Sequence, residues 1–476
     1  MNIRNVVKNT GALTMASVLS KAISFLVNIP LALHLGKEAL GLYATAYAFV
    51  NIFSYFNEFG LSQLMVQDAS RDSSKLPVYF GNALLVKVAA AIGIFLIMML
   101  CMMLMTSFSE IQCVMIVILG IAMGFNNVNQ TIYHYYQAKE KMSTAAGFQF
   151  LDTLLIATLT LGVIYVTHQG VVAVTVAHLM TYVLLTVLLF LALRKRIRPV
   201  VDKSIIPQMI GMGMPFGVQR AVSNIFPNVT ILVMAQLLVS EGEIGIFRVA
   251  QNLVVPLVFL PNAFSQSIYP ILYRLGVGDQ TRHQNSMEKV FKILAAVGVP
   301  ASLFLWMLSS EIIHWVYRGQ YDAAAPVFAM LCWYFALECL KSPLGDVMMT
   351  SNRRWQRTII QGIGLVLLVG LTVWAQPRYG LVGCVGAILA VEAFQFIGYY
   401  VYIRLKMYSI RIWRQLPPIL AASLIMMGTA YLVKSWHPLL VACLSASMYF
   451  VMLFAIDKEL RLLLMRILRG SPDSEE

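Results

Sequence analysis

Charged residues are scarce in this chain of 476 residues, where they make up 12% of the total, against about 25% in soluble proteins. Hydrophobic residues make up 59%, and the mean hydropathy is +0.74. A soluble fold could not bury so much apolar surface, and disordered chains are poor in apolar residues. We therefore expect an integral membrane protein, whose net charge of +13 reflects membrane topology rather than nucleic-acid binding.

Paired cysteine motifs are also missing. None of the six cysteines has CxxC spacing, and all lie in or beside apolar stretches, so we interpret them as apolar filler. The seven histidines are scattered, and only His178 lies well inside an apolar stretch. A hydrogen bond to a neighbouring helix is the simpler role for His178, and a proton relay is the alternative. We expect no metal site and no cofactor.

Stretches without charge indicate how often the chain crosses the membrane. Residues 153–193 contain no Asp, Glu, Lys or Arg, and a helix of about 20 residues spans a bilayer, so this stretch must hold two helices. Strands of a membrane barrel would be shorter and would alternate in polarity. The same logic predicts an all-α fold of fourteen transmembrane helices, at 10–34, 40–67, 78–105, 111–138, 142–167, 170–193, 205–238, 243–273, 287–315, 322–349, 355–376, 379–404, 413–434 and 437–457.

Basic residues predict the orientation of these helices. With a cytoplasmic N-terminus, the inner connections and tails hold 26 Lys and Arg residues and the outer connections hold four. This asymmetry predicts a multi-pass protein of the cell (inner, cytoplasmic) membrane with both termini cytoplasmic. The first apolar run contains Lys21 and lacks a convincing cleavage site, so we expect no signal peptide.

The predicted helices fall into two similar halves. Lys37–Tyr43 resembles Glu241–Phe247 at an offset of 204 residues, and Gly170–Ala173 resembles Gly380–Gly383 at an offset of 210. Similar offsets predict two six-helix bundles inserted in the same direction, as a parallel repeat. The predicted divisions are an N-terminal bundle at 1–193, a cytoplasmic linker at 194–204, a C-terminal bundle at 205–410, two additional helices at 411–457, and a basic interfacial helix and tail at 458–476.

Short motifs in both halves resemble a known transporter family. These are Leu35-Gly36, Gly41-Leu42-Tyr43, Glu58-Phe59-Gly60-Leu61, Gly245-Ile246-Phe247 and Tyr269-Pro270. They look like the polysaccharide-transporter (O-antigen flippase) family of the multidrug/oligosaccharidyl-lipid/polysaccharide (MOP) superfamily. The resemblance implies a fold similar to the multidrug (MATE) transporters. It also implies a flippase that moves a polyprenyl-pyrophosphate-linked oligosaccharide, a repeat unit of O-antigen, capsule or exopolysaccharide, from the cytoplasmic to the outer leaflet by alternating access.

A lipid II flippase is a related alternative, because those proteins also have fourteen helices and a basic residue where Ser20-Lys21 falls here. They carry another basic residue near the position of Gln251, where this chain departs from the pattern, although Arg248 lies one turn earlier. The partners that the resemblance implies are the lipid-linked substrate and the membrane. A polysaccharide polymerase or glycosyltransferases are further candidates, and nucleic acid is not.

Ionisable residues inside the predicted helices are the candidate site. The basic ones are Lys21, Lys87, Arg220, Arg248 and Lys341. A lone cation in a bilayer is costly, so it should face a hydrated cavity or a partner. The functional hypothesis is that Lys21, Lys87, Arg220 and Arg248 bind a pyrophosphate head group. The alternative is that Asp152 and Glu392 neutralise these cations, while Lys341 pairs with Glu338 three residues earlier.

Acids and prolines complete the set of candidates. Glu58, Asp152 and Glu392 could couple transport to protons or Na⁺, or act as counter-ions. Proline removes a helical hydrogen bond and bends the helix. The hinge candidates are Pro30, Pro215, Pro227 and Pro256, with static kinks as the alternative.

Two further function classes fit the sequence less well. A membrane glycosyltransferase or polymerase would need a sizeable outer loop, and the predicted outer turns are short, so we expect that the chain is not an enzyme. A drug/cation antiporter of the same superfamily would line its cavity with acids and aromatic residues. The excess of Lys and Arg instead favours an anionic, lipid-linked substrate.

Overall fold

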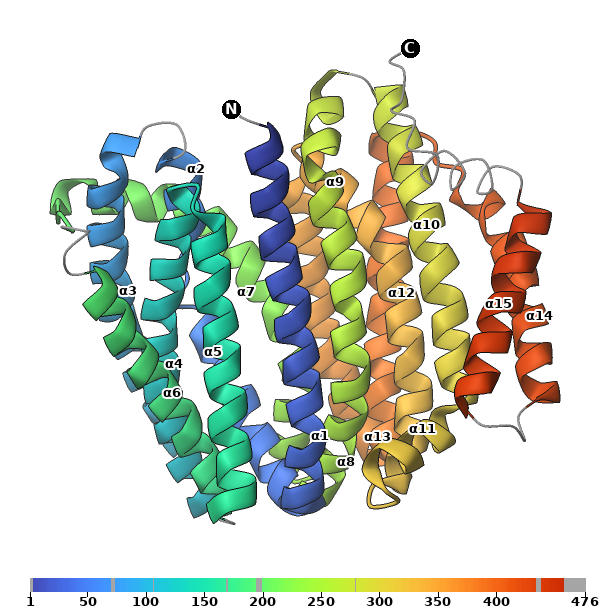
Figure 1. Cartoon of the computed structure of the whole chain (residues 1–476), viewed down its shortest axis with the longest axis horizontal. Helices are drawn as coiled ribbons and strands as arrows, with labels where there is room; N and C mark the ends of the chain where they lie inside the picture. The colour runs from blue at the N-terminus through green and yellow to red at the C-terminus, as the bar shows by residue number, and fades with distance from the viewer. Residues whose placement is uncertain are drawn as a thin grey trace. The chain divides into compact units, whose positions relative to one another are not determined.

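The computed structural model describes residues 3–69, 73–105, 107–167, 170–193, 199–278, 280–433 and 438–457. Every regular element in these ranges is a helix (Figure 1). Ten of the described helices are long and apolar enough to cross a membrane. The chain is therefore an all-α, multi-pass membrane protein, as its composition predicts.

Each of the fourteen predicted spans overlaps one or more of the helices. The longer helices are α1 (Ile3–Tyr55), α3 (Leu76–Leu104), α4 (Glu110–Ala138), α5 (Met142–Gly162), α6 (Val171–Leu193), α7 (Ile206–Gln236), α8 (Glu241–Val254), α9 (Phe259–Gly278), α10 (Gln280–Met307), α12 (Ala325–Thr350), α13 (Arg354–Lys406), α14 (Leu416–Leu432) and α15 (Pro438–Ile456). Two short helices, α2 (Leu61–Ala69) and α11 (Ser309–Tyr317), accompany them.

Helices α1 and α13 are each 53 residues long, which is too long for a single crossing. Each contains one glycine with a non-helical backbone, Gly36 at φ 70° and Gly380 at φ 58°. Positive φ is accessible to glycine without steric cost, so both glycines join two helices. These joints lie where the predicted spans 10–34 and 40–67, and 355–376 and 379–404, meet.

Three predicted spans are broken in ways that hydropathy did not reveal. The span at 287–315 divides into α10, which ends at Met307, and α11, which begins at Ser309. The span at 40–67 is interrupted after Tyr55 by a turn that contains Phe59 and Gly60, both with positive φ. The span at 243–273 is interrupted by a 3₁₀ turn, η4 (Val255–Val258), which contains Pro256. Apolar side chains are common in these segments, so a hydropathy pattern does not distinguish a broken helix from a continuous one.

The described chain forms two compact units. Unit 1 comprises residues 1–256, 313–324 and 361–387, and unit 2 comprises residues 257–312, 325–360 and 388–476. The division into six-helix bundles at 1–193 and 205–410 stays a prediction. Residues 194–198 of the predicted linker and the predicted interfacial helix and tail at 458–476 lie outside the described residues.

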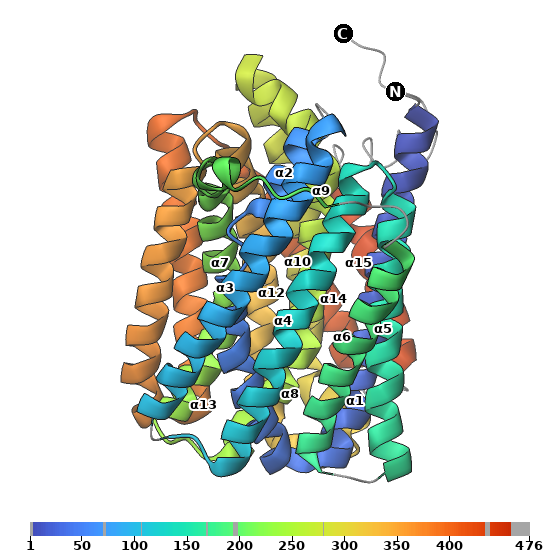
Figure 2. The ribbon, with the colours of Figure 1, turned by 90° about the vertical axis from the view of Figure 1, so that its left-hand side faces the viewer.

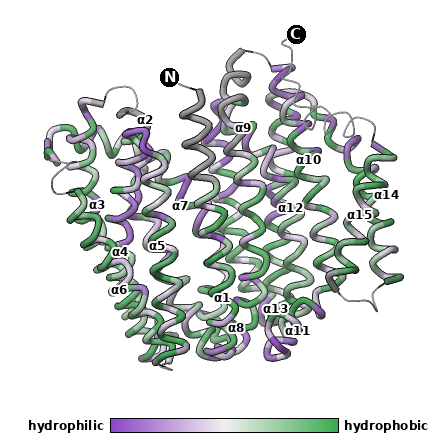
Figure 3. The backbone as a smooth tube through the Cα atoms, in the orientation of Figure 1, coloured by the Kyte–Doolittle hydropathy of each residue, from purple (hydrophilic) through white to green (hydrophobic). Residues whose placement is uncertain are grey.

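Within unit 1, α3, α4, α5 and α6 run side by side (Figure 2). Apolar residues predominate along these helices (Figure 3). Many apolar side chains of α3 also face outward: Ile92, Leu96 and Met103 are each more than half exposed. Soluble proteins rarely expose such apolar surfaces, and contact with lipid accounts for this one.

Unit 2 has its own apolar core. Helices α9, α10, α12, α14 and α15 pack in sequence around it, with α10 between α12 and α14. Phe291 of α10, Tyr399 of α13 and Tyr449 of α15 are among its buried side chains. The two C-terminal helices, α14 and α15, are thus part of this packed unit.

Candidate functional site

Glu58 lies in the turn between α1 and α2, and α7 packs directly against this turn. A Cβ atom on Gly60 would lie 2.0 Å from the carbonyl oxygen of Gly213, and one on Gly217 would lie 2.8 Å from the backbone carbonyl carbon of Phe59. Only glycine permits so close an approach of two backbones. The contact brings Arg220, one turn beyond Gly217 on α7, to the turn that holds Glu58.

Lys87 of α3 forms the tightest contact with this turn. Its ammonium group donates hydrogen bonds to Glu58 Oε2 at 2.9 Å and to Ser62 Oγ at 2.6 Å, and its side chain is fully buried. Burial of a cation without a partner would lower the free energy of unfolding by roughly several kcal/mol. Glu58 is therefore the counter-ion of Lys87, and the Lys87 ammonium is largely occupied by these two partners.

Arg220 approaches the same carboxylate from the other side. Its Nη1 atom lies 3.8 Å from Glu58 Oε1, and 52% of its side chain is exposed. His134 of α4 lies close enough to Glu58, Lys87 and Arg220 to interact with their charges, and its Nδ1 atom is 3.0 Å from Gln137 Oε1. One carboxylate thus serves two permanent cations, and Arg220 keeps donors that no protein group uses among the described residues.

Arg248 of α8 extends this group of cations. Its guanidinium group donates to Gln251 Oε1 at 3.1 Å and lies 5.8 Å from the centre of the Tyr47 ring. Tyr55, at the end of α1, interacts with both Arg220 and Arg248. The two arginines therefore face the same stretch of α1. We call Lys87, Arg220 and Arg248, together with Glu58, the basic cluster; it holds three cations and one acid.

The other candidates of unit 1 lie apart from this cluster. Lys21 is exposed on α1, and the structure shows no contact between it and the basic cluster. Asp152 of α5 is partly buried, and its Oδ1 atom has no hydrogen-bond partner among the described residues. The hypothesis that Asp152 and Glu392 neutralise Lys87 and Arg220 is not what the structure shows, because Glu58 pairs with both cations.

Glu392 has a different partner, in unit 2. Lys341 of α12 lies 2.7 Å from Glu338 and 2.5 Å from Glu392 of α13, and it also donates to Gln395 at 3.1 Å. The predicted pair of Lys341 and Glu338 is therefore present. The sequence did not reveal Glu392 as the second partner, because it lies 51 residues from Lys341 along the chain.

Asp346 is a buried acid that the sequence analysis missed. Its Oδ1 atom accepts a hydrogen bond from the Tyr269 hydroxyl at 2.8 Å and lies 3.7 Å from Arg357. The sequence did contain a signal for this residue, because Asp346 is an acid within the apolar span 322–349. The Arg357 side chain is largely buried against Asp346.

Three of the four hinge prolines lie inside helices, and the fourth lies in a 3₁₀ turn. Pro30 is inside α1, Pro215 and Pro227 are inside α7, and Pro256 is in η4. The Gln251 amide donates to the Pro227 carbonyl at 2.8 Å, which joins α8 to α7 beside Pro227. Their role as hinges stays a prediction.

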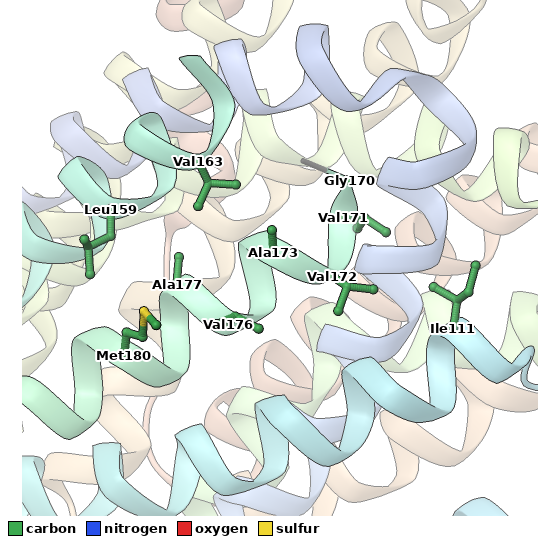
Figure 4. Close-up of a pocket in the computed structure, with 10 residues that line it drawn as sticks. All are labelled: Ile111, Leu159, Val163, Gly170, Val171, Val172, Ala173, Val176, Ala177 and Met180. Atoms are coloured by element: carbon green, nitrogen blue, oxygen red, sulfur yellow. The ribbon is translucent and has the colours of Figure 1, made fainter. Parts of the chain in front are cut away.

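Unit 1 also has a groove of about 640 Å³ between the ends of α4, α5 and α6 (Figure 4). All of its lining residues are apolar: Ile111, Leu159, Val163, Gly170, Val171, Val172, Ala173, Val176, Ala177 and Met180. A groove without a polar side chain has no charged group to bind a charged ligand. The basic cluster, rather than this groove, is the candidate site for an anionic head group.

Comparison with known proteins identifies the family. Residues 6–275, more than half of the chain, match the family model described as "Polysaccharide biosynthesis protein". The chain belongs to this family. The lipopolysaccharide biosynthesis protein WzxC of Escherichia coli (strain K12) is 27% identical over 134 residues, which cover 26% of this chain and 25% of WzxC. The match therefore spans about a quarter of that relative.

Solved structures confirm the fold of this chain. The lipid II flippase MurJ in an inward closed conformation superposes with a TM-score of 0.79 at 14% identity, covering 94% of this chain and 99% of MurJ. A MATE multidrug transporter of the MOP superfamily, in an inward-facing conformation, superposes with a TM-score of 0.67 at 14% identity. The match covers 81% of this chain and 95% of the transporter. The predicted fold, an all-α membrane protein similar to MATE transporters and flippases, is confirmed.

Proposed function

We propose that this chain is a flippase that moves a polyprenyl-pyrophosphate-linked oligosaccharide from the cytoplasmic to the outer leaflet of the cell membrane by alternating access. Both termini face the cytoplasm, and no covalent bond is made or broken. The match to the polysaccharide biosynthesis family and to WzxC supports a substrate of this class. Pro30, Pro215, Pro227 and Pro256 are the proposed bending points of the cycle.

The observation that carries the proposal is the excess of cations in the basic cluster. Glu58 offsets one positive charge, so two remain for a ligand, and a pyrophosphate is an anion of matching charge. Arginine binds phosphate through paired, charge-assisted hydrogen bonds. Arg220 is half exposed and Arg248 is partly exposed, whereas Lys87 is buried against Glu58 and Ser62. Arg220 and Arg248 are therefore the proposed head-group ligands, and Lys87 positions Glu58.

Two related functions differ from the proposed one in the ligand that they carry. A drug antiporter would present acids to an organic cation, and the basic cluster repels cations, although Tyr47 and Tyr55 lie beside it. A lipid II flippase would bind the same pyrophosphate, and the MurJ fold is shared. The glycan distinguishes lipid II from an O-antigen, capsule or exopolysaccharide unit.

The test is restoration of glycan export in cells that lack their own flippase, scored together with the amount of protein in the membrane. Arg220→Ala should abolish export at normal abundance, and Arg220→Lys should retain part of it, because the charge survives without the planar two-point contact. Arg378→Ala, which removes an exposed arginine of the same unit, is the matched control. Normal export by Arg220→Ala would refute the role of Arg220.

The substrate class is tested with the purified protein in proteoliposomes. A lipid-linked oligosaccharide should move between leaflets, while lipid II should move slowly and a cationic dye should not be transported. Rapid movement of lipid II would favour the lipid II flippase, and uptake of the dye would favour the antiporter.

A further inference from the structure

The cluster around Lys341 in unit 2 contains more acid than base. Glu338 and Glu392 both contact the Lys341 ammonium, at 2.7 Å and 2.5 Å, so the two carboxyl groups share one counter-ion. Glu392 is 1% exposed, Gln395 is 2% exposed and Lys341 is 8% exposed. Two carboxylates and one ammonium leave a net charge of −1 in a buried place, which is costly.

Two ionised carboxylates that share one ammonium repel each other, and a proton on either of them removes this repulsion. One proton would also make the cluster neutral. Glu338 and Glu392 would then share the proton, as two carboxyl groups in one site commonly do.

The neighbouring ionisable groups do not remove this excess. Tyr334 of α12 and Tyr399 of α13 face the cluster, and Tyr399 also lies near Arg357. Arg357 is paired with Asp346, which also binds Tyr269 of α9. Lys292, the buried lysine of α10, forms an ion pair with Asp457 at 2.8 Å. Each of these cations therefore has an acid of its own.

We infer that Glu338 and Glu392 form a binding site for one exchangeable proton, which is taken up and released once in each transport cycle. This inference rests on the proposed function for its role in transport, but the proton site itself does not. The Lys341 ammonium already contacts both carboxylates, so it occupies the position that Na⁺ would need. The geometry therefore points to a proton rather than to a metal cation.

The step is a simple proton exchange. A hydronium ion gives its proton to a carboxylate oxygen of Glu338 or Glu392, leaving water and changing the charge of the cluster from −1 to zero. Release to water on the opposite side restores the carboxylate. Neutral and charged clusters differ in the free energy of burial, so the proton biases which conformation unit 2 adopts.

The first experiment counts protons bound by the full-length protein in detergent. A pH indicator in weakly buffered solution is followed while the pH is lowered from about 9 to about 5.5, a window in which an ordinary glutamate takes up almost no proton. Glu338→Gln and Glu392→Gln should each bind one proton fewer than the wild type, because either variant leaves a neutral pair of one acid with Lys341. Glu311→Gln, which alters an exposed glutamate of unit 2, should match the wild type.

A shared proton has a further signature. The variant Glu338→Gln/Glu392→Gln/Lys341→Met should also lose one proton and not two, because both acids hold the same proton. If a glutamine variant does not fold, Glu392→Asp keeps the carboxyl group and should retain the full proton count. Equal proton counts for the wild type and both single variants would overturn the site.

Export in cells then tests the role in transport. Glu338→Gln and Glu392→Gln should lose at least tenfold in glycan export at normal abundance. Normal export by a variant that binds one proton fewer would overturn the proposal that this proton is coupled to transport. A wild-type protein that exports no glycan but shows the one-proton difference would overturn the proposed function and leave the proton site intact.

Discussion

Gly41 and Gly245 make reciprocal contacts where α1 crosses α8. A Cβ atom on Gly41 would lie 1.8 Å from the carbonyl oxygen of Glu241, and one on Gly245 would lie 1.9 Å from the carbonyl oxygen of Lys37. Lys37 and Gly41 precede Glu241 and Gly245 by the same offset of 204 residues. Residues matched between the two halves thus touch each other in pairs, which supports the proposed duplication.

We predict that Gly41→Ala forces α1 and α8 apart. A methyl group 1.8 Å from a backbone oxygen cannot be accommodated by a side-chain rotation, so we expect a loss of about 1–3 kcal/mol or more. The measurement is thermal unfolding of the purified protein in detergent. Gly242→Ala is the matched control: its Cβ would lie 3.6 Å from the Lys37 side chain, and alanine also favours the helix. Equal melting temperatures for the two variants would contradict the close contact.

We predict that Glu58→Gln destabilises the protein, because it leaves the buried Lys87 ammonium without a counter-ion. Removal of one partner of a buried ion pair typically costs about 3–5 kcal/mol. Folded protein is measured by size-exclusion chromatography after extraction from the membrane. Adding Lys87→Met should restore much of the folded amount. If Glu58→Gln were as abundant as the wild type, Glu58 would not be the counter-ion on which the burial of Lys87 depends.

We predict that Asp152→Asn leaves the amount of folded protein unchanged, because the structure shows no ion pair for Asp152 among the described residues. For the same reason, Asp152→Asn should not restore glycan export to Arg220→Ala. Export and membrane abundance are scored together for the two single variants and the double variant. Recovery of export in the double variant would show that Arg220 serves Asp152 rather than the substrate.

The proposed orientation is tested with reporter fusions. Fusions after Lys141 and Arg357 should report a cytoplasmic location, and a fusion after Gln376 should report an outside location. Gln376 lies just before Gly380, the joint between the two halves of α13. A cytoplasmic signal at Gln376 would show that α13 does not cross the membrane twice.

The sequence alone determined the membrane class and the approximate positions of the helices, although not where three of them are interrupted. Hydropathy is a local property, because a helix that contacts lipid must be apolar along its length whatever its neighbours are. Local spacing also revealed the pair of Glu338 and Lys341, which lie three residues apart on one helix.

Only the tertiary structure decided which charges meet. Glu58 joins Lys87, 29 residues away, and Arg220 of α7, because Gly213 and Gly217 allow α7 to reach the turn after α1. Glu392 joins Lys341 rather than the basic cluster. Hydropathy does not encode these partners, because they depend on which helix faces pack together, and close packing depends on small residues distant in the chain.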